Sequence, residues 1–143
     1  MSSTVDVNVL VYASNSTSRF HEEARATLDR LVAGPDLLYL FWPVLMGYLR
    51  IATHPALLPR PLPPDEVAAN IGALLALPHV RTVGEEEGFW DVYRAVTSDV
   101  TVRGNLVPDA HLVALMRQHG VTKLWTRDRD FRKFDAIQVE DPS

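Results

Sequence analysis

Cysteine is absent from the 143 residues of this sequence. Disulfide bonds, thiol nucleophiles and thiolate zinc sites are therefore excluded. The sequence also lacks a Gly-x-Ser-x-Gly elbow and a glycine-rich phosphate loop, so no motif indicates a serine hydrolase or a P-loop nucleotide site. The five histidines include no His-x-x-x-His pair, and we expect surface or capping roles for those at helix and loop ends.

Long apolar runs are missing as well. No stretch reaches the roughly 20 apolar residues that span a membrane, and MSSTVDVNVL lacks the features of a signal peptide. We therefore expect a cytoplasmic protein without membrane association. The formal net charge of −4 argues against nucleic-acid binding over the whole surface. One basic strip stands out near the C-terminus, with Lys123, Arg127, Arg129, Arg132 and Lys133.

Short apolar runs alternate with longer segments whose apolar residues have helical spacing. We predict strands at 37–41, 80–83, 123–126 and 137–140, and helices at 21–32, 42–53, 64–77, 85–97 and 108–119. Five of the ten prolines lie in residues 55–64, which we interpret as an irregular connector. The pattern is typical of parallel βαβ units. We expect one domain, residues 1–143, with an α/β fold: a three-layer α/β/α sandwich around a parallel sheet of four to five strands.

The first segment, from Val5 to Tyr12, has two interpretations. It is either one buried strand, or a short strand that ends near Asp6 and is followed by a helix opening at Asn8. We favour the second interpretation, because asparagine is a common helix N-cap. Asp6 would then stand at the carboxyl end of a strand.

Four aspartates lie where a parallel sheet would bring them together. Asp6 ends the first strand, Asp109 starts the last long helix, and Asp128 and Asp130 follow a late strand. The carboxyl ends of parallel strands meet the start of a neighbouring helix at one edge of the sheet. Each acid also has an ordinary explanation, as a turn residue, a cap or a partner of the helix dipole. Their joint placement is more specific than any one of them.

Such a group of carboxylates indicates a site for Mg²⁺ or Mn²⁺. Carboxylates that lie close together repel each other, and hard cations prefer oxygen ligands. Beside a phosphodiester, the cation would neutralise charge and generate a hydroxide-like nucleophile. Asn8 and Thr126 neighbour the acids, and they either orient the carboxylates and water or serve only as caps. Farther away, Phe89, Trp90 and Tyr93 form an aromatic helix face that packs on the core or on a second copy of the chain.

Four segments resemble a PIN-domain protein, and more closely a VapC-type toxin of a bacterial toxin–antitoxin pair. They are VDVNVLVYA, WPVLMGYLRIATHP, GNLVPDAHLVAL and LWTRDRDFRKF, in the family's order over nearly the whole chain. The resemblance implies a PIN-like fold and an endoribonuclease dependent on Mg²⁺ or Mn²⁺, commonly a homodimer. It also implies a VapB-like antitoxin that binds DNA and blocks the site.

The same resemblance implies roles for individual residues. Asp6, Asp109 and Asp128 would be metal ligands, and Asp130 would be an accessory catalytic acid. Thr126 would be the polar neighbour of the late aspartates.

Supporting roles follow for residues beside these acids. Asn8 accompanies Asp6 in the D-x-N segment. Arg127 and Arg129 would guide the RNA backbone toward the acids.

One departure from the family pattern concerns the second long helix. The family usually has a glutamate three residues before an arginine, and Arg50 matches that arginine, so the expected position is Gly47. A glutamate from residues 85–87 would be a substitute, although their place before a predicted helix favours dipole stabilisation.

Two other functions stay open. The incomplete acid set is compatible with a non-catalytic PIN-like module that binds RNA or protein. A small phosphatase with Asp6 as nucleophile is a weaker alternative, because no Ser/Thr and Lys motifs of that chemistry are present.

Overall fold

A computed structural model describes residues 1–143 of the chain. The strands are β1 (Ser2–Val5), β2 (Leu37–Phe41), β3 (Val80–Val83), β4 (Lys123–Trp125) and β5 (Gln138–Glu140). The helices are α1 (Val7–Ser14), α2 (His21–Val32), α3 (Trp42–Ala52), α4 (Pro64–Leu75), α5 (Phe89–Val96) and α6 (Leu106–Gln118). A short 3₁₀ helix, η1, spans Arg129–Lys133.

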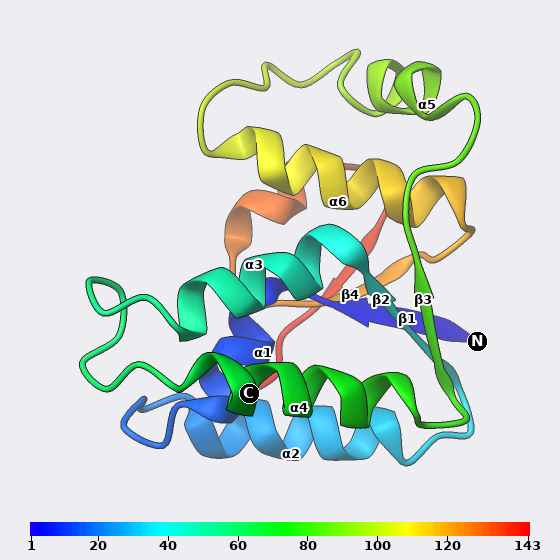
Figure 1. Cartoon of the computed structure of the whole chain (residues 1–143). Coiled ribbons are helices and arrows are strands. Elements are labelled where there is room, and N and C mark those ends of the chain that lie inside the picture. Colours follow the sequence, from blue (N-terminus) through cyan, green and yellow to red (C-terminus); the bar gives the residue numbers. More distant parts are fainter.

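The five strands form one parallel sheet in the order β3-β2-β1-β4-β5. Helices α1 to α4 pack against one another on one side of the sheet, whereas α6 covers the other side and carries α5 on its outer surface (Figure 1). The predicted three-layer α/β/α sandwich is therefore confirmed. Because β1 is the central strand, whatever follows it lies in the middle of the sheet edge.

Burial explains the apolar residues of the central strands. Helices cover both faces of the parallel sheet, and Val5, Leu38, Leu40 and Leu124 are fully buried. Helix α6 is also buried over much of its surface, because it lies between the sheet and α5. The 29 buried hydrophobic residues form one cluster. None of the helices is both long and apolar enough to cross a membrane.

The N-terminal segment follows the second of its two interpretations, with β1 ending at Val5 and α1 beginning directly after Asp6. Asp6, not Asn8, occupies the N-cap position of α1. Asp6 therefore stands directly after the carboxyl end of β1, as the sequence predicted.

The helix predicted at 85–97 was wrong at its start, since α5 begins only at Phe89. Gly88 precedes it with a positive φ of 83°, in a turn where the N–H of Phe89 donates to the Glu86 carbonyl at 3.1 Å. The side chain of Gln118 accepts the backbone N–H of Glu86 at 3.0 Å and donates to the carbonyl groups of Glu86 and Glu87 at 3.2 Å. Glu85, Glu86 and Glu87 therefore lie beside α6 and not in the first turn of α5.

Candidate active site

Strand register places Asp6 at the carboxyl edge of the sheet. Val5 lies opposite Trp125 in the pairing of β1 with β4, and the backbone N–H of Asp6 donates to the Trp125 carbonyl at 3.1 Å. The Asp6 carbonyl accepts from the N–H of Val9 at 3.0 Å and so starts helix α1. Only 7 % of Asp6 is exposed. The carboxylate is thus fixed at the point where the central strand becomes a helix.

Thr126 joins Asp6 to the loop after β4. Its hydroxyl donates to Asp6 Oδ2 at 3.0 Å and accepts the backbone N–H of Asp128 at 3.0 Å. Asp128 in turn accepts the N–H of Asp130 at 2.9 Å through Oδ1, which caps η1. Thr126 itself is buried, at 2 % exposure. One hydroxyl therefore sets the positions of two acids that lie far apart in sequence.

Helix α6 brings the remaining acid to the same place. Asp109 lies in its first turn, and one carboxylate oxygen each from Asp109, Asp128 and Asp130 lies within 4.8 Å of the others. Asp6 lies outside this trio and connects to it through Thr126. The structure therefore brings together all four predicted aspartates, with three in a tight group and the buried fourth beside them.

Asp6 and Asp109 have raised pKa values, chiefly because both carboxyl groups are removed from water. Burial and, after it, the negative charges of Asp128, Asp6 and Asp130 together raise the pKa of Asp109 to about 7. Burial also raises the pKa of Asp6, and the charge of Asp128 adds to the effect, although the hydrogen bond from Thr126 offsets part of it. The only cation that opposes the rise at Asp109 is Lys133, which lies 3.5 Å from Asp130.

This donor set fits a hard divalent cation. Its ligand atoms are carboxylate oxygens, which Mg²⁺ and Mn²⁺ prefer, with no imidazole or thiolate within the group. The neighbouring carboxylates add to the effect of burial on the pKa of Asp109, and a bound cation would offset their negative charge. Asp109, Asp128 and Asp130 are placed to hold such an ion, with Asp6 adjoining them.

A cavity of about 360 Å³ opens beside Asp6 and Asp109, between α3 and α6. Gly47 lines it, so the position where the family usually has a glutamate does face the acids. A Cβ atom at Gly47 would lie 3.2 Å from Cγ2 of Val7, a contact that requires a small movement of the valine. We shall call this space the Gly47 cavity. Its α3 wall has no carboxylate.

Glu85 is not a substitute for that carboxylate. Its side chain binds His111, and this hydrogen bond lowers the pKa of Glu85. The Glu85 side chain does not line the Gly47 cavity, whereas His111 does. His111 and Asp109 are two positions apart on α6, a spacing that normally directs side chains to different helix faces. In the structure, Asp109 and His111 both line the Gly47 cavity, which extends around the beginning of α6. Helical spacing alone does not predict that these two side chains share a cavity.

On its other side, Asp6 borders a smaller cavity of about 270 Å³ that Asn8 and Arg127 also line. The guanidinium of Arg127 lies 4.0 Å from the centre of the Phe20 ring and binds Glu23, with Asp141 at 3.7 Å. The charge of Arg127 is therefore largely compensated. Arg129 is exposed and makes no ion pair, so its charge is free.

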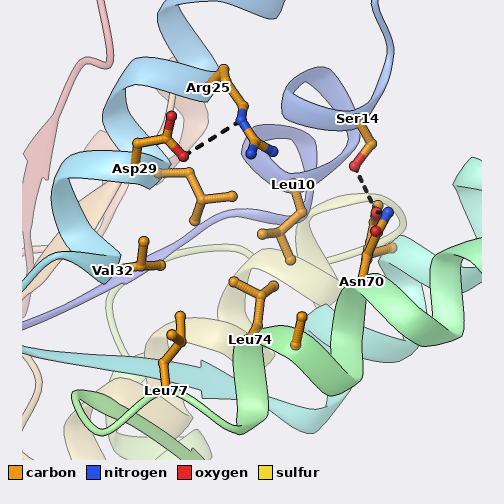
Figure 2. Close-up of a pocket in the computed structure, with 11 residues that line it drawn as sticks. Leu10, Ser14, Arg25, Asp29, Val32, Asn70, Leu74 and Leu77 are labelled. Atoms are coloured by element: carbon orange, nitrogen blue, oxygen red, sulfur yellow. Dashed lines mark hydrogen bonds and ion pairs between the residues drawn. The ribbon is translucent and has the colours of Figure 1, made fainter.

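A further cavity, of about 270 Å³, lies between α1, α2 and α4 (Figure 2). Its polar groups are already paired, because Arg25 binds Asp29 at 3.4 Å and Tyr48 bonds to Ser14 at 2.6 Å and Asn70 at 3.1 Å. None of the four clustered aspartates lines it. The chemistry of the molecule is concentrated at the sheet edge.

Comparison with known proteins agrees with this geometry. The sequence profile described as "PIN domain" matches residues 4–137. The chain belongs to the PIN-domain family. This PIN domain is 56 % identical to Ribonuclease VapC48 of Mycobacterium tuberculosis over 142 residues, which are 99 % of this chain and 98 % of the relative. It is 34 % identical to Ribonuclease VapC37 of the same species over 138 residues, 96 % of this chain and 95 % of the relative. It is therefore a VapC-type member of the family.

Solved structures share the fold. The Rickettsia felis VapBC2 complex bound to a promoter DNA fragment contains a chain with a TM-score of 0.70 and 13 % identity, covering 99 % of this PIN domain and 98 % of that chain. Mycobacterium tuberculosis VapC20, a toxin that cleaves the sarcin-ricin loop, has a TM-score of 0.68 and 16 % identity, covering 94 % and 98 %. At these identities the likeness concerns the fold alone.

Proposed function

We propose that this PIN domain is the toxin of a toxin–antitoxin pair and an endoribonuclease that requires Mg²⁺ or Mn²⁺. The observation that carries the proposal is the meeting of Asp6, Asp109, Asp128 and Asp130 at one sheet edge, where the pKa of Asp109 is raised to about 7. The ribonuclease names of VapC48 and VapC37 support the choice of RNA as substrate.

The residues of the site would bind the cation, orient the attacking water or hold the carboxylates in place. Asp109 and Asp128 would hold the cation together with Asp130, which the structure groups with them, and Asp6, expected as a ligand from the sequence, would complete the site from beside this trio. On binding, the cation would neutralise charge on the phosphodiester and lower the pKa of water. Asp128 and Asp130 would orient the attacking water. Thr126 would hold Asp6 and Asp128 in place. Hydrolysis would leave a 5′-phosphate and a 3′-hydroxyl.

Basic and polar residues around the acids would bind the RNA. Arg129, whose charge is free, is better placed for the RNA backbone than Arg127, which is paired with Glu23. Asn8 lines the smaller cavity beside Asp6, where it would contact water or the sugar-phosphate chain.

The proposal includes protein partners. Chains of this fold occur in complexes of toxin and antitoxin, such as VapBC2, and we propose a VapB-like antitoxin for this PIN domain. We also propose a homodimer that uses the exposed Trp90 of α5. The cytoplasm is where such a toxin would meet its RNA.

Cleavage of total RNA with Mg²⁺ or Mn²⁺ tests the function. The wild type should cleave, and Asp6→Asn and Asp109→Asn should each lose about 100-fold or more in rate, as expected when a metal ligand or its support is removed. Asp65→Asn, an exposed acid at the start of α4, is the matched control and should cleave normally. Equal cleavage by all four proteins would refute the site.

The alternative, a non-catalytic module, is motivated by Gly47. Isothermal titration calorimetry separates the two functions. A wild-type chain that binds neither Mg²⁺ nor Mn²⁺ at millimolar concentration, and cleaves no RNA, would be a binding module.

A further inference from the structure

We propose that the Gly47 cavity receives a nucleobase of the nucleotide next to the scissile phosphate, and that Arg50 binds a phosphate at its mouth. This inference rests on the proposed endoribonuclease function. It assigns a specificity role to residues of α3 that lie outside the group of aspartates.

The first support is position. The Gly47 cavity is lined by Asp6 and Asp109 on one side, so a group that enters it lies directly beside the site of hydrolysis. The scissile phosphate and the adjoining base of an RNA strand are covalently joined through one ribose. A phosphate at the aspartates therefore brings a neighbouring base to the cavity entrance.

The second support is the chemistry and size of the walls. Apolar side chains from α3, α6 and η1 line the cavity: Pro43, Val44, Met46, Ile51, Leu112 and Phe131. Ligand sites measure about 300–1,000 Å³ and are mostly apolar, so about 360 Å³ suits one small planar group. Single-stranded RNA is recognised through bases that leave the stack and pack on protein side chains.

The third support is Gly47 itself. A glutamate at this position would place a charged, desolvated group in the cavity, at a cost to any apolar occupant. Glycine leaves the wall hollow and uncharged. The departure from the family pattern thus enlarges the space in which a base can lie.

Charge supplies the fourth support. Arg50 is exposed, lines the cavity and forms no ion pair, even though the site beside it is acidic. A guanidinium group binds phosphate oxygens through two parallel hydrogen bonds. Arg50 is therefore a free cation that lines the same cavity as Asp6 and Asp109.

The smaller cavity on the other side of Asp6 is a poorer base site. Its aromatic residue, Phe20, already has two guanidinium groups over its ring, Arg19 at 4.7 Å and Arg127 at 4.0 Å. These cations occupy positions that a stacked base would need. The Gly47 cavity has no such occupant.

The test compares intact and abasic RNA. Sequencing of the fragment ends first locates a preferred cleavage site of the wild type. Three oligoribonucleotides are then made: one intact, and two in which the nucleotide on the 5′ or the 3′ side of the scissile phosphate lacks its base. Affinities are measured by fluorescence anisotropy with Asp109→Asn protein, so that cleavage does not interfere.

One of the two abasic oligonucleotides should bind about 10-fold more weakly than the intact one, because a stacked base contributes about 1–3 kcal/mol. Adding Gly47→Leu, which fills the cavity, should abolish this discrimination. Met46→Ala should reduce it and does not threaten the fold, since 48 % of Met46 is exposed. The matched control is Leu57→Ala, at 50 % exposure on the connector between α3 and α4, which should preserve it.

Arg50→Gln should weaken binding of all three oligonucleotides by a similar factor, whereas Arg60→Gln on the connector should not. Equal binding of intact and abasic RNA, or discrimination that survives both Gly47→Leu and Met46→Ala, would overturn the inference while leaving the nuclease function in place. A wild type that cleaves no RNA would overturn both.

Discussion

Thr126 and Asp6 are 120 positions apart in sequence and share a hydrogen bond of 3.0 Å at the edge of the sheet. The bond exists because β1 and β4 are neighbours in parallel register, so the residues that follow Val5 and Trp125 emerge side by side. The same hydroxyl accepts the N–H of Asp128. Thr126 is therefore the link between the acid that ends β1 and the acids that follow β4.

Replacing Thr126 by valine should impair cleavage more than stability. Valine preserves the shape but leaves Asp6 Oδ2 and the Asp128 N–H without their partner, so both carboxylates lose their fixed orientation. We expect a 10- to 100-fold loss of divalent affinity or cleavage rate, as is typical for residues that orient metal ligands. The unfolding free energy should fall by about 1–3 kcal/mol. RNA cleavage rates and denaturant titration measure the two effects.

Thr4→Val is the matched control. Thr4 in β1 is buried like Thr126, and its hydroxyl donates to the Tyr39 carbonyl at 2.6 Å and not to an acid. The Thr4→Val variant should be less stable than the wild type but should retain its cleavage rate per folded molecule. Thr126→Ser, which keeps the hydroxyl, should retain most of the activity that Thr126→Val loses. If Thr4→Val and Thr126→Val lower activity equally, the link has no specific role.

Asp109 should make the metal-free protein less stable as pH rises. Its pKa is raised from an ordinary value of 3.8 to about 7, so the folded chain holds this proton more tightly than the unfolded chain. Stability from this group is present below about pH 4 and is lost as pH rises to about 7. Asp109→Asn should therefore raise the melting temperature in EDTA at pH 8. Solvent screening of this partly exposed group limits the gain to about 1 kcal/mol, or about 4 °C.

The gain from Asp109→Asn should be smaller at pH 5, where the wild-type carboxyl is already protonated in the folded state. Millimolar Mg²⁺ or Mn²⁺ should reverse the order at pH 8, since the ion stabilises only a chain that binds it. Scanning fluorimetry at both pH values, with and without the ion, gives all four comparisons. A wild type that melts higher than Asp109→Asn in EDTA at pH 8 would contradict the charge argument.

Sequence alone predicted more of the fold than of the site's detail. The alternation of apolar runs identified the parallel sheet, and that topology was enough to bring Asp6 to Asp128. The start of α5 was predicted wrongly because a run of glutamates resembles a first helical turn, whereas a long-range contact from Gln118 holds Glu86 in an irregular segment before the helix. The contact between His111 and Glu85 was missed for the same reason. Local patterns predict elements, but side-chain partners across the fold require the packing itself.

Restoring a carboxylate at Gly47 should change metal binding. Gly47→Glu would add an oxygen ligand beside Asp6 and Asp109 and should tighten Mn²⁺ binding by about 10-fold, although Val7 must yield slightly to the new Cβ at 3.2 Å. Gly47→Gln meets the same steric demand without the charge and is the control. Calorimetry measures the Mn²⁺ affinity of both variants. Equal Mn²⁺ affinities of Gly47→Glu and Gly47→Gln would show that a side chain at position 47 does not contact the ion.

The exposed face of α5 should form the interface between two copies of the chain. Trp90 is 65 % exposed and stacks on Tyr93, with ring centres 5.5 Å apart and planes at 12°, which gives a flat aromatic surface in contact with solvent. Central tryptophans commonly contribute about 2 kcal/mol or more to an interface, so Trp90→Glu should weaken the dimer at least about 30-fold. Sedimentation velocity at micromolar concentration should then show monomers, while Leu57→Glu, at 50 % exposure on the connector, should remain dimeric. Trp90 lies on α5, outside both cavities at Asp6, so the monomeric variant should still bind the short intact oligonucleotide. A wild-type protein that is itself monomeric would contradict the proposed dimer interface.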